Sequence, residues 1–186
     1  MDDEDDLPVL GCVVDAGRGS LPYALIHGES LVACAAWALG EAGVAAVDLE
    51  SAWEQVRESG LSLVLHDALC PMTPSAFIAE CLDLAQAQDC VVVAVRPVTD
   101  TVKEIADDRV GDTVDRESLH AVTSPVVLPP SALSSLSGRL EGDFPALVAA
   151  LSAAGFEVRT VTAPPQGRRV TSAEELRLLE VLTAPN

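Results

Sequence analysis

The clearest strand in the sequence is LSLVLHD at residues 61–67, a short apolar run that ends on a histidine and an aspartate. Thr73-Pro74 follows and predicts the start of a helix whose apolar positions (Phe77, Ile78, Cys81, Leu82 and Ala85) keep helical spacing. A second apolar run, CVVVAV at residues 90–95, predicts the next strand. Strands that are apolar throughout and joined by a helix indicate an α/β fold, with a parallel sheet covered by helices.

Towards the N-terminus, the same alternation of strands and helices continues. Residues 7–14 (LPVLGCVV) predict a buried strand, and a glycine-containing loop, DAGRGS at residues 15–20, follows it. Ser30 is expected to cap a helix that ends near Gly43. Val44–Val47 and Ser51–Ser59 then predict a strand and a short helix.

Towards the C-terminus, the pattern changes. Thr101–Ile105 and Val110–Val114 predict a polar hairpin, which needs a partner surface because a two-stranded ribbon has little core of its own. Residues 129–142 are rich in serine, proline and glycine and are expected to form a connection. A helix is predicted over about 143–154, a strand over 157–161, and a last helix after the capping box Ser172-x-x-Glu175.

Length and charge limit the possible functions. The 186 residues suffice for one domain, taken as 7–186 after an acidic tail at 1–6. The net charge of −18 repels nucleic acid and anionic membranes, so neither is an expected partner. No apolar run approaches the roughly 20 residues of a membrane span, and the acidic start is unlike a signal peptide, so we expect a cytoplasmic protein.

Four segments, in order along the chain, resemble motifs of the cytidylyltransferases that activate 2-C-methyl-D-erythritol 4-phosphate. The family motifs are Val-His-Asp-Ala-Ala-Arg-Pro, Pro-Val-x-Asp-Thr-x-Lys, Thr-Val-Asp-Arg and Val-Thr-x-Pro-Glu-Asp-Leu. Their counterparts are LVLHDA at 63–68, PVTDTVK at 97–103, TVDR at 113–116 and VTSAEEL at 170–176.

The resemblance implies a Rossmann-like nucleotidyltransferase fold, a three-layer sandwich with a protruding hairpin arm at about 99–116. It also implies a homodimer in which the arm reaches the neighbouring subunit. The implied reaction is attack of a sugar-alcohol phosphate on the α-phosphorus of CTP, with Mg²⁺ as cofactor and pyrophosphate as leaving group.

The resemblance also suggests roles for individual residues. Those expected to bind the nucleotide are Ala16, Gly17, Gly19 and Asp67, and Asp67 is also the expected metal ligand. Thr101 and Arg116 match the arm residues that hold the methylerythritol phosphate across the dimer. Arg169 stands in the place of a C-terminal lysine, and Arg18 is a candidate to reach a phosphate; both are expected to be the catalytic cations.

The nucleotide half departs from the family pattern. The family loop reads Ala-Ala-Gly-x-Gly-x-Arg followed by Pro-Lys, whereas here Asp15 replaces an alanine and Tyr23 replaces the lysine. Cys70 stands where the family has an arginine, and the segment that forms the cytosine pocket has no counterpart between residues 47 and 61.

Three hypotheses follow. The first is a divergent family member, a pseudoenzyme with weak or lost CTP-dependent transfer and a regulatory or scaffolding role. The second is an active nucleotidyltransferase with an altered substrate that uses Arg18 and Arg169 as replacement cations. The third is a plain interaction module that keeps only the core.

Overall fold

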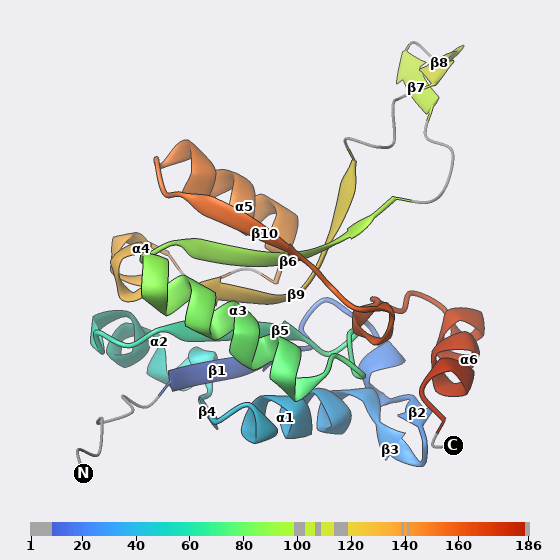
Figure 1. The fold of residues 1–186 in the computed structure, drawn as a ribbon, viewed down its shortest axis with the longest axis horizontal. Coiled ribbons are helices and arrows are strands. Elements are labelled where there is room, and N and C mark those ends of the chain that lie inside the picture. Colours follow the sequence, from blue (N-terminus) through green and yellow to red (C-terminus); the bar gives the residue numbers. More distant parts are fainter. Residues whose placement is uncertain are drawn as a thin grey trace.

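The structure is a computed structural model that describes residues 9–98, 103–106, 109–113, 119–138, 140 and 142–184. Its centre is a six-stranded sheet with the order β10-β6-β9-β5-β1-β4 (Figure 1). The strands of this sheet are β1 (Val9–Val14), β4 (Val44–Ala46), β5 (Leu63–Asp67), β6 (Val91–Pro97), β9 (His120–Leu128) and β10 (Val158–Thr162). The α-helices are α1 (Leu31–Glu41), α2 (Leu49–Glu58), α3 (Ser75–Gln88), α4 (Pro130–Ser135), α5 (Phe144–Ala153) and α6 (Ala173–Leu182).

The predicted α/β fold with a mainly parallel sheet is confirmed. β1 pairs in parallel with β4 and β5, and β10 pairs in parallel with β6. β9 is the exception, because it runs antiparallel between β5 and β6. Our reading of the sequence missed this strand, since its first half is polar and Pro125 lies in its middle, where a proline argues against a central strand.

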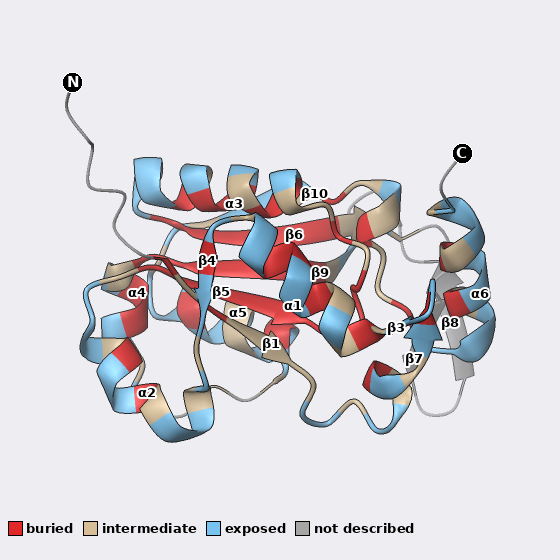
Figure 2. Ribbon diagram, turned by 90° about the horizontal axis from the view of Figure 1, so that it is seen from below, coloured by how far each residue is buried: buried red, intermediate tan, exposed pale blue. Residues whose placement is uncertain are grey.

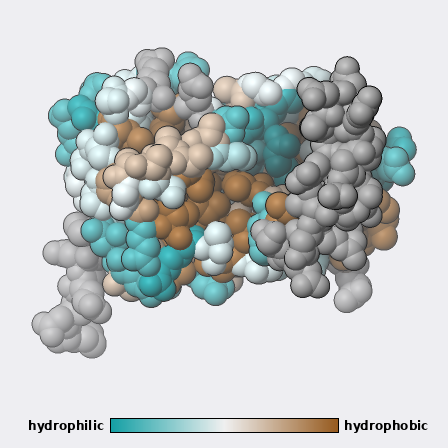
Figure 3. Space-filling view, turned by 90° about the horizontal axis from the view of Figure 1, so that it is seen from above, coloured by the Kyte–Doolittle hydropathy of each residue, from teal (hydrophilic) through white to brown (hydrophobic). Residues whose placement is uncertain are grey.

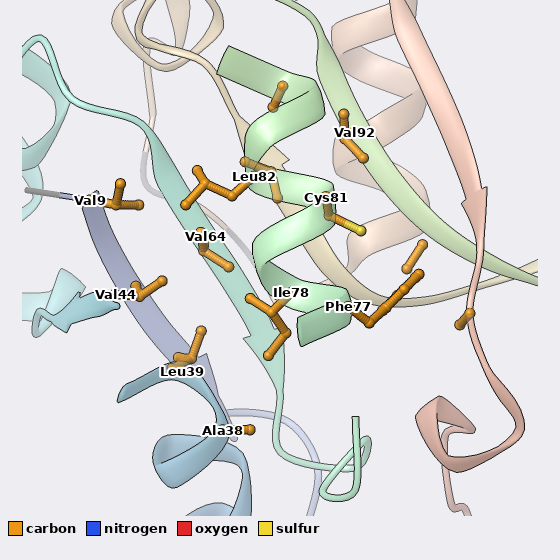
Figure 4. Close-up of a cluster of buried hydrophobic side chains, with 14 of the residues drawn as sticks. Val9, Ala38, Leu39, Val44, Val64, Phe77, Ile78, Cys81, Leu82 and Val92 are labelled. Carbon is orange, nitrogen blue, oxygen red and sulfur yellow. The ribbon is translucent and has the colours of Figure 1, made fainter. Parts of the chain in front are cut away.

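Helices cover both faces of the sheet and give the expected three layers. Side chains along β5 alternate between two cores: Val64 packs with α1 and α3, whereas Leu63 and Leu65 pack with α2, α4 and α5. Figure 4 shows the first core, in which Ile78 and Leu82 of α3 lie over Val64. Figure 2 shows buried residues concentrated in the strands and on the inward sides of the helices.

The face on which α5 lies is shown in Figure 3, where hydrophobic side chains gather near the centre. α5 contributes the partly buried Leu147 and Val148 to the second core.

The prediction of a helix near 143–154 is confirmed, but the prediction that 129–142 is only a connection is wrong. Pro130 begins α4, because a proline is well placed in the first turn of a helix, where its missing N–H is not needed.

A third, smaller core holds the C-terminal helix at one end of the sheet. α6 packs through Leu176 and Leu179 on Ile26 and Leu31, beside the short strands β2 (Leu25–Ile26) and β3 (Glu29–Ser30) (Figure 1). The segment before α6 therefore returns to the end of β5, where Val170 N donates a 2.8 Å hydrogen bond to Leu69 O.

The predicted hairpin is present as an antiparallel pair, β7 (Lys103–Ala106) and β8 (Arg109–Thr113). The hairpin lies in the chain between β6 and β9. These two strands form its paired stem: their pairing ends at Pro97 and His120, and beyond it Val98 N donates a 3.2 Å hydrogen bond to Leu119 O. That the hairpin reaches a second subunit stays a prediction. Within the described residues, no helix has both the length and the apolar character needed to cross a bilayer.

Candidate functional site

The glycine-containing loop leaves the carboxyl end of β1 and turns sharply. Gly17 and Gly19 have φ angles of +74° and +64°, a left-handed backbone that disfavours other residues. Arg18 N, between them, donates a 3.1 Å hydrogen bond to Asp15 O and closes the turn. The loop ends in a 3₁₀ turn, η1 (Leu21–Tyr23). The predicted nucleotide-binding residues Ala16, Gly17 and Gly19 thus lie on one tight loop.

Asp67 ends the neighbouring strand and lies at the same edge of the sheet, in register with Val14 of β1. Only 3% of Asp67 is exposed, and its position is fixed by two hydrogen bonds. Asp67 Oδ1 accepts one from Leu69 N at 2.9 Å, and Asp67 N donates the other to Ser124 Oγ at 2.9 Å. The carboxylate is therefore buried and preorganised at the end of β5.

Both candidate catalytic cations contact this carboxylate. Arg18 Nε lies 3.2 Å from Asp67 Oδ1, and Arg18 Nη2 lies 3.1 Å from Oδ2. Arg169 Nε lies 3.0 Å from Oδ2. The Arg18 side chain is 13% exposed and also donates to the Gly142 carbonyl, whereas the Arg169 side chain is 34% exposed.

The structure thus brings together Arg18, Arg169 and Asp67, residues that lie far apart in the sequence. Two guanidinium groups and one carboxylate leave a net charge of +1 at this point. Thr101 and Arg116, the residues expected to hold the acceptor phosphate, lie outside the described residues, and so does half of the predicted arm. Their roles stay predictions.

A buried polar pair, His66 and Ser124, adjoins Asp67. His66 Nδ1 contacts Ser124 Oγ, and both residues are completely buried. Burial disfavours the charged imidazole and lowers the pKa of His66 to about 4, although the nearby Asp67 charge acts in the opposite direction. Burial, followed by the charge of Asp67, raises the pKa of the Cys70 thiol. Neither group is therefore expected to be charged at neutral pH.

Sequence reasoning gave Ser124 and Gly142 no role, yet both contact the site. Ser124 anchors the end of β5, and Gly142 supplies a carbonyl to Arg18. The sequence Ser124-Pro125-Val126 partly resembles a Thr-Pro-Gln segment of the family, and this resemblance is a signal for Ser124. Gly142 gave none, because a backbone carbonyl can come from any residue.

A cavity of about 300 Å³ opens beside the loop, at the carboxyl end of β1. Its apolar wall includes Trp53 and Phe144, and its acidic residues are Asp15, Asp48 and Glu50. Asp48 caps α2 by accepting from Glu50 N at 2.9 Å, and Asp15 Oδ2 accepts from Tyr23 Oη at 3.0 Å. No arginine or lysine lines this cavity among the residues that the structure describes. The described lining is therefore apolar and acidic.

The site offers Mg²⁺ a single carboxylate. Over the described ranges, no three histidine, cysteine, aspartate or glutamate side chains gather as a metal cluster. Mg²⁺ commonly binds through one or two carboxylates together with substrate phosphates and water, so Asp67 fits as a ligand when a phosphate completes the shell. Both of its oxygens contact guanidinium groups, which a metal ion would have to displace.

Comparisons with known proteins agree with the arrangement of the fold. The family model described as IspD, 2-C-methyl-D-erythritol 4-phosphate cytidylyltransferase, matches residues 46–184. A cytidylyltransferase of that name from Bacillus cytotoxicus is 33% identical over 135 residues, covering 69% of this chain and 58% of that protein. The bifunctional enzyme IspD/IspF of Clavibacter michiganensis is 33% identical over 126 residues, covering 66% of this chain and 30% of that protein.

The fold likeness extends further along the chain than the sequence likeness. The crystal structure of 2-C-methyl-D-erythritol 4-phosphate cytidylyltransferase from Thermus thermophilus superposes with a TM-score of 0.74 at 19% identity. It covers 96% of this chain and 100% of that one. This chain spans about a third of the bifunctional relatives and just over half of the Bacillus protein. On the family match and the shared fold, the chain belongs to the IspD cytidylyltransferase family.

Proposed function

We propose that this chain is a divergent IspD-family protein in which transfer of CMP from CTP to 2-C-methyl-D-erythritol 4-phosphate is weak or lost. One observation carries the proposal: the cations of the site, Arg18 and Arg169, are both paired with Asp67. A triphosphate would have to displace Asp67 from both arginines, and this competition opposes its binding.

The size of the expected loss follows from the chemistry. Nucleotidyl transfer depends on positioning and on cations that neutralise charge developing on the phosphates. Loss of one preorganised donor typically costs on the order of 10²–10³ in rate. With Tyr23 in the place of the loop lysine and Cys70 in the place of an arginine, we expect a rate at least about 10³-fold below that of an active relative.

A pyrophosphate-release assay with CTP, Mg²⁺ and 2-C-methyl-D-erythritol 4-phosphate tests the proposal. The Bacillus cytotoxicus cytidylyltransferase, 33% identical, serves as the positive control. We expect no release above background from this chain at an enzyme concentration that gives rapid release with the control. Turnover within about tenfold of the control that disappears in Asp67→Ala would contradict the proposal.

A second candidate is an active nucleotidyltransferase with an altered substrate. It is favoured by the convergence of two guanidinium groups on one point, within 3.2 Å of the same carboxylate. In that case Asp67 would hold Mg²⁺, which supplies Lewis-acid polarisation of the phosphates, while Arg18 and Arg169 would bind phosphate oxygens. Melting temperatures measured with a panel of nucleoside triphosphates and Mg²⁺ separate the two candidates. A shift of several degrees with any triphosphate supports the active enzyme, and no shift at millimolar concentration supports the first proposal.

We also propose that the chain forms a homodimer through the segment near 99–116 and functions in the cytoplasm as a regulatory or scaffolding protein. The proposal is supported by the polar sequence of this segment and by its paired stem at Val98 and Leu119. Sedimentation of the full chain and of a variant lacking 101–114 tests the dimer. We expect a dimer that becomes a monomer on deletion, and a monomeric full chain would refute the proposal.

A further inference from the structure

The carboxylate of Asp67 has the contacts that a bound anion would have. Arg18 grips it side-on with two nitrogens, at 3.2 Å and 3.1 Å, and Arg169 adds a third nitrogen at 3.0 Å. Leu69 N donates a further hydrogen bond at 2.9 Å. Guanidinium groups bind carboxylate and phosphate oxygens with the same two-pronged geometry, so one anion can replace the other between them.

We propose that Asp67 is an internal counter-anion that occupies an anion site formed by Arg18 and Arg169. In this arrangement the chain's own carboxylate keeps phosphate and pyrophosphate out of the site. The inference rests on the proposed function, because it gives a specific cause for the weak or lost transfer. It concerns the binding of a free anion and involves no covalent step.

Arg18 is held in this arrangement from a second side. It donates to the Gly142 carbonyl, and Gly142 lies so close to the loop that an added Cβ would be 3.0 Å from Val14 Cγ1 and 3.3 Å from Ala16 O. The guanidinium therefore connects the loop after β1, the end of β5 and the residue just before the cap of α5. An incoming anion has to compete for a side chain that already has a buried partner and a backbone partner.

Arg169 is the less constrained of the two. Its side chain is 34% exposed, against 13% for Arg18, and Asp67 is the partner found for it among the described residues. The adjacent backbone is fixed by the hydrogen bond from Val170 N to Leu69 O. Removal of the Asp67 charge is therefore expected to leave two cations facing one point, with little movement of the main chain.

The experiment compares the wild-type chain with Asp67→Asn, which has nearly the same shape and keeps an oxygen to accept from Leu69 N. Inorganic pyrophosphate is titrated calorimetrically into each protein, with a chelator present to remove divalent cations. We expect no measurable binding to the wild-type chain at millimolar pyrophosphate, and at least about a tenfold gain in affinity in Asp67→Asn.

Glu54→Gln is the matched control. Glu54 accepts two hydrogen bonds from Arg57, at 3.1 Å and 2.8 Å, so this change also removes a carboxylate from an arginine and alters the net charge equally. It acts on an exposed pair on α2, and we expect no gain in pyrophosphate binding. The double variants Asp67→Asn/Arg18→Gln and Asp67→Asn/Arg169→Gln are expected to lose the gain.

Three results would overturn the inference: no difference in binding between the wild-type chain and Asp67→Asn, an equal gain in Glu54→Gln, or a gain that survives in the two double variants. Circular dichroism checks the fold of each variant, and Asp67→Ser replaces Asp67→Asn if the latter does not fold. The assay contains no nucleotide and measures no transfer. Failure of the inference is therefore distinct from failure of the proposed function, which the pyrophosphate-release assay measures separately.

Discussion

Two regions of the molecule share one sheet but differ in their likeness to the family. Residues 46–184 match the family model, whereas β1, its glycine loop and α1 precede the match. The structural likeness nevertheless covers 96% of the chain, and β1 lies inside the sheet between β5 and β4. The early region therefore keeps its place in the fold although its sequence falls outside the match.

The difference separates what packing requires from what chemistry requires. A strand such as β1 needs apolar or small side chains of suitable size, a condition that many sequences meet. A loop that binds a triphosphate needs cations at particular positions, and here the loop carries Asp15 and Tyr23 together with an arginine paired to Asp67. The fold can thus persist where the residues of the nucleotide loop depart from the family pattern.

The largest expected effect tests whether the two regions contribute equally to the core. Leu39 of α1 precedes the family match, Leu63 of β5 lies within it, and both are at least 98% buried. Leu39→Ala and Leu63→Ala should each lower the free energy of unfolding by about 2–5 kcal/mol, because each leaves a cavity in a packed core. Urea denaturation measures both. A loss below about 1 kcal/mol in Leu39→Ala alone would mean that the region before the family match is loosely packed. It would contradict the conclusion that this region keeps its place in the fold.

The next effect belongs to the matched region only and depends on pH. His66 is buried, and its pKa is lowered from 6.5 to about 4. Well above pH 6.5 the imidazole is neutral in both the folded and the unfolded chain. As the pH falls from 6.5 towards 4, the unfolded chain binds a proton at His66 that the folded chain does not bind. The folded state therefore loses stability over this range. We expect this group to contribute about 2–3 kcal/mol to the difference in unfolding free energy between about pH 7 and pH 4.5.

His66→Asn is the variant that isolates this contribution. Asparagine can keep a polar contact to Ser124 but does not titrate, so its unfolding free energy should fall less between the same two pH values. Denaturation of both proteins at each pH gives the comparison. An identical loss in the wild-type chain and the variant would show that other groups, and not His66, carry the pH dependence.

The sequence predicted the fold well where local patterns and the sheet agree. The run at 61–67, the helix around Ile78 and the cap at Ser30 are confirmed, because each follows from periodicity or from a local hydrogen bond. β9 was missed because its stability comes from strands on both sides, which compensate for the proline within it. Tertiary pairing of this kind leaves little local signal.

The candidate site was predictable in its members but not in their contacts. The sequence singled out Asp67 as a nucleotide and metal residue, and Arg18 and Arg169 as catalytic cations, without pairing them with one another. Their mutual pairing depends on the paths of three distant segments and on the carbonyl of Gly142, none of which is encoded in residue type. The opposite charges gave a possible clue, yet the chain has 29 acidic residues with which any arginine could have paired.

A smaller effect tests how tightly the early region is fitted into the sheet. Gly11 lies in β1, where an added Cβ would be 2.3 Å from Val44 Cγ1 and 3.2 Å from Val64 O. Gly11→Ala should lower the free energy of unfolding by about 1–3 kcal/mol, because the backbone oxygen cannot move aside without disturbing β5. Gly40→Ala is the control, since nothing lies within 4 Å of its added Cβ, and this helical site should gain slightly in stability.

The smallest expected effect comes from removing one helix cap before the family match, which begins at residue 46, and one within it. Ser30 Oγ accepts from Ala33 N at 3.3 Å at the start of α1, and Ser172 Oγ accepts from Glu175 N at 3.2 Å at the start of α6. Replacement of either serine by alanine removes one bond to an otherwise unpaired helix N–H, so each change should cost about 1 kcal/mol. At Ser172 the other half of the capping box is displaced, since Glu175 accepts from Thr171 N at 2.6 Å and from Thr171 Oγ1 at 2.7 Å. Glu175 thus still joins the first turn of α6 to the preceding residues in Ser172→Ala, and thermal unfolding should show a slightly smaller loss there than in Ser30→Ala. A markedly larger loss in Ser172→Ala would mean that the matched region depends more strongly on its local bonds, and the two regions would then differ in stability as well as in chemistry.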